Sequence, residues 1–229
     1  MNFKRIFNTI SILFAVTSTI VLTSCSAIGG AASDEGIIEF DTKAIDKNHP
    51  LYGFAPNSAQ LQFKGDQFLI EMSTMGLFNM SIIGDNKAKT MAQMIKFMDL
   101  RQACIETEEH LQSQNEEYRL TFEETSDTKE IAGYTCKRVI AKKVNSTEPP
   151  FDVWYTDDLG KPDCNSLTPY SEIKGMLMDY KIKKFGMEMQ FTATKYSDTK
   201  IDDKVFKVPA DMKIVDQKEM QKFFDELEE

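Results

Sequence analysis

Histidine is nearly absent from this sequence, which makes several classes of enzyme site difficult to build. The 229 residues contain only two histidines, His49 and His110. Neither belongs to a cluster with the spacing of metal ligands. Neither has a neighbouring nucleophile that would suggest a Ser-His-Asp or Cys-His arrangement. The sequence also lacks a P-loop and a dinucleotide-binding glycine motif. We therefore predict no enzymatic activity, no metal site and no cofactor.

Charged residues are missing between Arg5 and Asp34. The stretch follows a basic start, and its apolar part runs from Ile10 to Leu22. It is marginal for a permanent membrane span, which needs about 20 apolar residues. A basic start, a short apolar core and small residues at its end are typical of a secretory signal.

The end of this stretch, Leu22-Thr-Ser-Cys25, resembles the bacterial lipobox. The resemblance implies cleavage before Cys25 and acylation of that cysteine. Several acyl chains, each contributing about 0.8 kcal/mol per buried CH₂, would anchor the protein stably. The alternative is an ordinary signal with a chance cysteine at its end.

This interpretation divides the chain into three parts. Residues 1–24 form a signal peptide, residues 25–35 a lipidated flexible tether rich in small side chains, and residues 36–229 a single domain. The mature chain would have 229 − 24 = 205 residues, enough for one domain with a sizeable core. Ser26, together with the late first acids Asp34 and Glu35, favours the periplasmic face of the outer membrane.

The excess of negative charge limits the possible partners. The formal net charge is −9, and removing Lys4 and Arg5 leaves 25 basic and 36 acidic residues, or −11. Such a surface argues against nucleic acid and against electrostatic binding to anionic lipids. The expected partners are the membrane, through the lipid anchor, and a lipid, a lipidated protein or another envelope protein.

Cysteine is scarce, and its role is open beyond Cys25. Cys104, Cys136 and Cys164 allow at most one internal disulfide. Cys136 sits in a strand pattern, so we favour Cys104 with Cys164. Three buried free thiols are an equally acceptable alternative.

Apolar and polar residues alternate with a period of two over most of the domain, which predicts an antiparallel sheet. A turn at Gly65-Asp66 places Phe63 opposite Phe68 and Leu61 opposite Ile70. A second turn near Asp85-Asn86 would place Met80 opposite Met91. Further strands are expected around 118–122, 134–141 and 151–155, and a hairpin at 176–192. The late hairpin has one apolar and one charged face, which predicts a sheet with one dry and one wet side.

Two helices and one loop complete the prediction. The acidic stretch Glu106–Glu117 is expected to be a short helix. Asp216 can cap a C-terminal helix whose apolar stripe comprises Met220, Phe223, Phe224 and Leu227. Residues 160–171, with glycine and prolines, are expected to form a loop.

Methionine is the one unusually frequent residue. Excluding Met1, the chain keeps 12 methionines: six fall between Met72 and Met98, and four more lie on the 176–189 hairpin. Methionine is flexible and adapts to varied apolar partners. The candidate hydrophobic-ligand face comprises Met80, Met91, Met176, Met178, Met187, Met189 and Phe191. The alternative is an ordinary core that happens to be rich in methionine.

Three short motifs resemble a family of exported Bacteroidota proteins of unknown function. They are Ile131-Ala-Gly-Tyr-Thr-Cys-Lys137, Val153-Trp-Tyr-Thr-Asp157 and Phe206-Lys-Val-Pro-Ala210. The family is similar in pattern to the outer-membrane lipoprotein carriers LolA and LolB. The resemblance covers the chain from about Glu39 onward. It implies a mainly β (α+β) fold: a curved antiparallel sheet, or open half-barrel, with a few helices covering the concave side.

In the carriers the concave side binds acyl chains. The resemblance therefore implies a tethered protein that binds a hydrophobic ligand or a lipidated partner. The alternative is a structural or protein-interaction lipoprotein with a filled core and no small-molecule ligand.

Overall fold

The computed structural model describes residues 33–74, 78–184 and 186–228. The predicted signal peptide, Cys25 and nearly all of the tether lie outside these residues. The elements, with η marking 3₁₀ helices, are β1 (Glu35–Ala44), η1 (Pro50–Phe54), β2 (Ser58–Lys64), β3 (Gln67–Thr74), β4 (Phe78–Asp85), β5 (Thr90–Phe97), β6 (Leu100–Glu106), α1 (Glu108–Glu117), β7 (Leu120–Ile131), β8 (Tyr134–Lys143), β9 (Phe151–Thr156), β10 (Met176–Lys184), β11 (Met187–Ser197), η2 (Asp203–Phe206), β12 (Lys213–Val215) and α2 (Gln217–Glu228).

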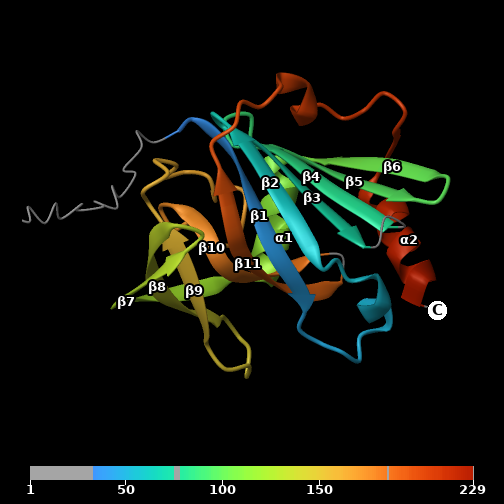
Figure 1. The fold of residues 1–229 in the computed structure, drawn as a ribbon. Coiled ribbons are helices and arrows are strands. Elements are labelled where there is room, and N and C mark those ends of the chain that lie inside the picture. The colour runs from blue at the N-terminus through green and yellow to red at the C-terminus, as the bar shows by residue number, and fades with distance from the viewer. Residues whose placement is uncertain (1–32, 75–77, 185, 229) are drawn as a thin grey trace, which may run out of the picture. The chain divides into compact units, whose positions relative to one another are not determined.

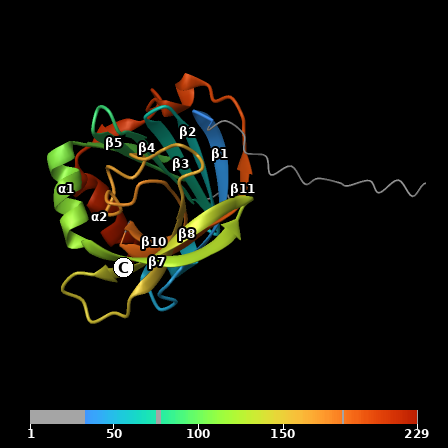
Figure 2. The ribbon, with the colours of Figure 1, turned by 90° about the vertical axis from the view of Figure 1, so that its left-hand side faces the viewer.

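All the described strands belong to one open, curved sheet of twelve strands, which confirms the predicted mainly β class (Figure 1). The order is β12-β6-β5-β4-β3-β2-β1-β11-β10-β9-β8-β7, and only the β12–β6 pair is parallel. Helix α1 follows β6 and precedes β7, which is the opposite edge strand. The chain must therefore cross from one side of the sheet to the other at α1. Figure 2 shows the 157–175 connection lying within the curve of the sheet, with α1 and α2 at the side that the sheet leaves open.

The first predicted hairpin is confirmed, because β2 and β3 pair Leu61 with Ile70 and Phe63 with Phe68. The pairing predicted for the next hairpin is wrong: Met80 lies opposite Ile95, and Met91 lies opposite Gly84. The reason is a longer turn, in which the Asp85 carboxylate accepts a hydrogen bond from the Ala88 amide at 2.8 Å. Both methionines still face the inner side of the sheet.

The two helices differ in how well their starts were predicted. The predicted helix at 106–117 begins two residues late, because Glu106 is the last residue of β6. Helix α2 begins as expected: the Asp216 carboxylate accepts a hydrogen bond from the Glu219 amide at 2.9 Å. Its residues Met220 and Phe224 are buried, as the apolar stripe required.

The concave side of the sheet carries the main core, and the convex side is less polar than predicted. A second apolar cluster lies there, where Ile201, Phe206 and Met212 of the segment before β12 pack against Leu69 and Met94. The prediction of one fully wet face is therefore wrong for β3–β6. A sequence pattern does not reveal which later segment will cover a strand. Within the described residues, no helix is long and apolar enough to span a bilayer.

Candidate functional site

All seven residues of the predicted ligand face lie on the inner side of the sheet. They come from β4, β5, β10 and β11, and each is between 0% and 4% exposed. The sequence therefore predicted their common face correctly. Their near-complete burial leaves little surface for a ligand on most of them.

Only part of this face lines an empty space. A cavity of about 100 Å³ lies between the sheet and the connection from β9 to β10. Met91, Met176 and Phe191 line it, whereas Met80, Met178, Met187 and Met189 do not. These four methionines are packed core residues, as the alternative interpretation expected. The structure thus divides the predicted face into a cavity wall and a filled core.

Residues 157–175, here called the cover loop, form the side of the cavity opposite the sheet. The loop contains no helix or strand, as predicted, yet it enters the core. Leu167 and Ile173 are buried, and Tyr170 is 0% exposed. The Tyr170 ring meets Tyr180 of β10 edge-on, with centroids 5.8 Å apart. Tyr180 in turn stacks on Phe191 at 5.2 Å. A chain of three rings therefore joins the cover loop to the cavity wall.

Polar contacts let this loop pass through an apolar interior. Asn165 donates hydrogen bonds to the backbone carbonyls of Ile173 at 2.9 Å and Gly175 at 2.7 Å. The Cys164 thiol donates to the Gly175 carbonyl at 3.3 Å, and burial raises the pKa of this thiol to about 12. A buried loop is tolerated only when its backbone groups are paired in this way.

Lys161 stands at the rim of the cavity. Its ammonium donates to the Asp34 carboxylate and, at 3.3 Å, to the Gly65 carbonyl, and it lies 5.8 Å from the Phe63 ring centroid. The Lys161 side chain is 12% exposed, against 79% for Asp34. Lys161 thereby joins the cover loop to the β2–β3 turn and to the first described residues of the domain.

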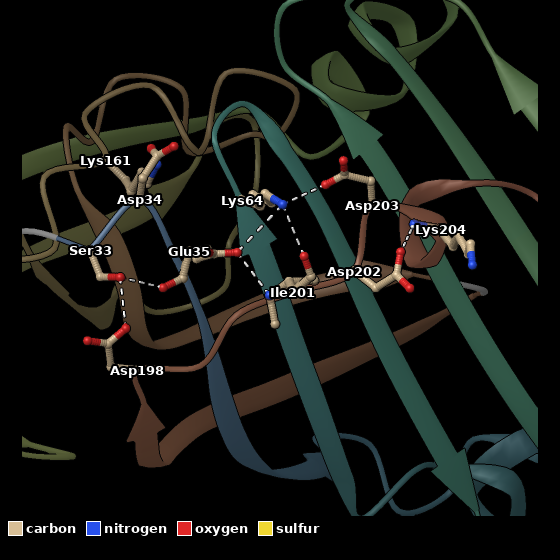
Figure 3. A network of polar contacts seen from close by, with 10 residues as sticks. All are labelled: Ser33, Asp34, Glu35, Lys64, Lys161, Asp198, Ile201, Asp202, Asp203 and Lys204. Atoms are coloured by element: carbon tan, nitrogen blue, oxygen red, sulfur yellow. Dashed lines mark hydrogen bonds and ion pairs between the residues drawn. The ribbon is translucent and has the colours of Figure 1, made fainter.

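A neighbouring polar network fixes the same end of the domain (Figure 3). Lys64 donates to the Ile201 carbonyl at 3.1 Å and to Asp203 at 2.6 Å, and lies 3.7 Å from Glu35. Glu35 accepts from the Ile201 amide at 2.9 Å. The start of β1 is therefore held both to the cover loop and to the segment that crosses the convex face.

The remaining predicted site residues are the cysteines. Cys104, Cys136 and Cys164 are free thiols, so the predicted Cys104–Cys164 disulfide is not formed. Cys104 lies on β6, and Cys164 lies on the cover loop, where it contacts Gly175. Cys25 lies outside the described residues. Within the part of the chain that the structure describes, no group of three His, Cys, Asp or Glu side chains could hold a metal ion.

Sequence reasoning missed the residues of the cover loop that matter most to the cavity. Lys161, Asn165 and Tyr170 occupy a stretch without periodicity. The only available signal was the loop's one aromatic residue, Tyr170, together with three scattered aliphatic residues, Leu159, Leu167 and Ile173.

Comparison with known proteins places the domain in a family. A family profile described as "Domain of unknown function (DUF4412)" matches residues 54–212. The chain belongs to this family. The match spans β2 to η2 and includes the cover loop, so every residue that lines the cavity lies in the DUF4412 region. No curated protein matches the chain significantly.

One solved structure with a similar fold is described as "Structure of PNGF-II in P21 space group". It has a TM-score of 0.53 and 18% sequence identity over 85% of this chain. The match covers 34% of the PNGF-II chain, so most of that protein has no counterpart here. At this identity the similarity concerns the fold alone.

Proposed function

We propose that this DUF4412 protein is a lipid-anchored envelope protein that binds an acyl chain, or a similar hydrophobic ligand, between its sheet and its cover loop. The observation that carries the proposal is the apolar cavity walled by Met91, Met176 and Phe191. An apolar space with a few polar groups at its rim is the usual form of a small-molecule site. The resemblance to LolA and LolB adds the acyl chain as the ligand class.

The size of the cavity restricts how the ligand binds. The cavity of about 100 Å³ is smaller than the 300–1,000 Å³ of typical ligand pockets, and closer to an apolar cavity of about 150 Å³ that accepts benzene. It therefore holds only the end of an acyl chain. A longer chain enters when the cover loop moves outward and exposes more of the methionine-rich face. Each additional buried CH₂ contributes about 0.8 kcal/mol.

Native mass spectrometry of the full mature lipoprotein, extracted in a mild detergent, tests this proposal. We expect a bound lipid that dissociates at higher collision energy. Met176→Trp fills the cavity and should abolish the bound species. Met98→Trp changes an exposed methionine, 81% accessible, and should leave the lipid in place. A folded protein with no bound lipid and no uptake of a fluorescent fatty acid would exclude the proposal.

The burial of Met80, Met178, Met187 and Met189 favours a second candidate. In it, the concave face is a filled core and the acidic surface meets another envelope protein. Crosslinking in cells, followed by purification of the lipoprotein, separates the two candidates. A protein partner recovered without any bound lipid supports the second.

Anchoring at Cys25 is the part of the proposal that rests on the lipobox-like sequence. We propose cleavage before Cys25, acylation of its thiol and location at the periplasmic face of the outer membrane, with no catalytic role. Cys25→Ser should abolish incorporation of a labelled palmitate and release the protein from the membrane fraction. Retention of the label by this variant would refute the assignment.

A further inference from the structure

A second, larger hollow lies beside the cavity. It has a volume of about 620 Å³ and is lined by residues of α1, α2, β5, β6 and β10. We call it the α1–α2 groove. His110 and Gln114 line it from α1, and Met220 and Phe224 line it from α2. It is far more polar than the methionine-walled cavity.

Glu106 lines this groove and has an incomplete set of partners. The residue is 2% exposed. Its Oε1 accepts hydrogen bonds from the side-chain amides of Gln93 and, at 3.3 Å, Gln114. Its Oε2 has no partner among the described residues, although it is buried. A buried carboxylate oxygen without a donor is energetically unfavourable and is rare in folded proteins.

The groove and the cavity meet at β5 and β6. Met91, which lines the cavity, is the cross-strand partner of Glu106. Paired residues on neighbouring antiparallel strands face the same side, with Cβ atoms about 5 Å apart. Ile182 lines both spaces. One ligand can therefore occupy the cavity with an apolar tail and the groove with a polar head.

We propose that Glu106 binds the amine head group of an amphiphile whose tail lies in the cavity. This inference rests on the proposed function and adds the chemistry of the head group. Both donors that reach Glu106 are neutral amides, so a cation supplied by the ligand would neutralise the buried carboxylate. Only Oε2 is available, which suits a compact ammonium better than a guanidinium that binds two oxygens.

The other charged residues of the groove are less suited to this role. Glu117, Lys183 and Lys218 line it too, but all three are exposed. Solvent and salt screen exposed charges strongly, whereas a buried carboxylate is screened much less. Glu117 is therefore a matched control, because it is a carboxylate of the same groove with access to water.

Methyl NMR of the mature lipoprotein in lipid nanodiscs, labelled with ¹³C at the methionine methyls, tests the inference. The probes are octylammonium and 1-octanol, which share a tail and differ in the head. Met91 reports on the cavity and Met220, which is 5% exposed, on the groove. We expect octylammonium to bind at least about tenfold more tightly than octanol, with shifts at both methyls.

Glu106→Gln should reduce this preference to less than about twofold, while Glu117→Gln keeps it. The glutamine retains an oxygen for Gln93 and Gln114, and an unchanged Met94 signal verifies the fold. Two results would overturn the head-group inference: equal affinity for the two probes in the wild-type protein, or a preference that survives Glu106→Gln. If octanol still shifts the Met91 signal, the proposed function is unaffected by either result. A Met91 signal that neither probe shifts would overturn the proposed function as well.

Discussion

Tyr170 donates a hydrogen bond from its hydroxyl to the backbone carbonyl of Lys181, and this bond fixes the cover loop to β10. The tyrosine is fully buried, and burial raises the pKa of its phenol well above the usual value. The hydroxyl therefore stays protonated and remains a donor at any pH at which the protein is folded. The hydrogen bond that attaches the cover loop to β10 is therefore independent of pH.

Tyr170→Phe removes that donor and leaves the Lys181 carbonyl unpaired. A buried unsatisfied group costs about 1–3 kcal/mol, so the free energy of unfolding should fall by that amount. Urea denaturation followed by circular dichroism measures it. Tyr155→Phe, at a half-buried residue of β9, is the control and should have little effect. An unchanged midpoint for Tyr170→Phe would show that the bond is not formed in solution.

Lys161→Met should loosen the rim of the cavity without unfolding the protein. It removes an ion pair to the exposed Asp34 but keeps an apolar stem beside Phe63. The Asp34 side of the pair is open to solvent, and such ion pairs contribute at most about 1 kcal/mol, so stability should change little. Fluorescent fatty-acid exchange should become faster. Lys174→Met removes an exposed ion pair with Asp163 on the same loop and should leave exchange unchanged. Equal exchange rates in both variants would contradict a role of Lys161 at the rim.

Glu188 should contribute to loss of stability in acid. Burial favours its neutral form, but hydrogen bonds from Lys143 and Tyr118 outweigh burial and lower the pKa of its carboxyl below the usual value. A lowered folded-state pKa means that the contribution is complete above the unfolded pKa, near 4.3, and is lost as the pH falls through the folded value.

Urea midpoints measured between pH 7 and pH 3 test this expectation. Glu188→Gln should flatten the decline at the acid end. Glu148→Gln removes the second carboxylate that pairs with Lys143, a more exposed one, and is the control variant. Identical acid limbs for the wild type and Glu188→Gln would refute this role.

The three free thiols should react slowly in the folded protein. Burial raises the pKa of Cys136 to about 11 and that of Cys164 to about 12. Burial also raises the pKa of Cys104. The reactive thiolate is therefore scarce near neutral pH. Mass spectrometry after maleimide treatment should find little labelling in the folded state and three labels on Cys104, Cys136 and Cys164 after denaturation without reductant. A single label would instead indicate a disulfide.

Several parts of the fold were predictable because local patterns determine them. The alternation around Gly65-Asp66 placed Leu61 and Phe63 opposite their actual partners, and Asp216 identified the start of α2. The common face of Met176 and Phe191 followed from strand periodicity alone. These features need no information about distant segments.

Other features depend on contacts between segments far apart in sequence. The burial of Tyr170 within a loop requires the Lys181 carbonyl as its partner, and a loop pattern does not indicate one. Glu106 was predicted to lie at the start of a helix. Its actual place at the buried end of β6 depends on hydrogen bonds from Gln93 and Gln114, which the local sequence does not reveal. The partial filling of the methionine-rich face depends on the cover loop. The common inner face of the methionines could therefore be predicted, but its division into cavity and core could not.

The most direct test of the central claim is to locate an acyl chain inside the domain. A stearate with a nitroxide near its methyl end, added to the protein in nanodiscs, should broaden the ¹³C-methyl signals of Met72, Met91 and Met176. Met94, which is 3% exposed and packs in the cluster on the convex face, should be broadened less. Broadening that is strongest at the three cavity methionines is the result that acyl-chain binding predicts. Unchanged Met91 and Met176 signals at saturating probe would contradict it.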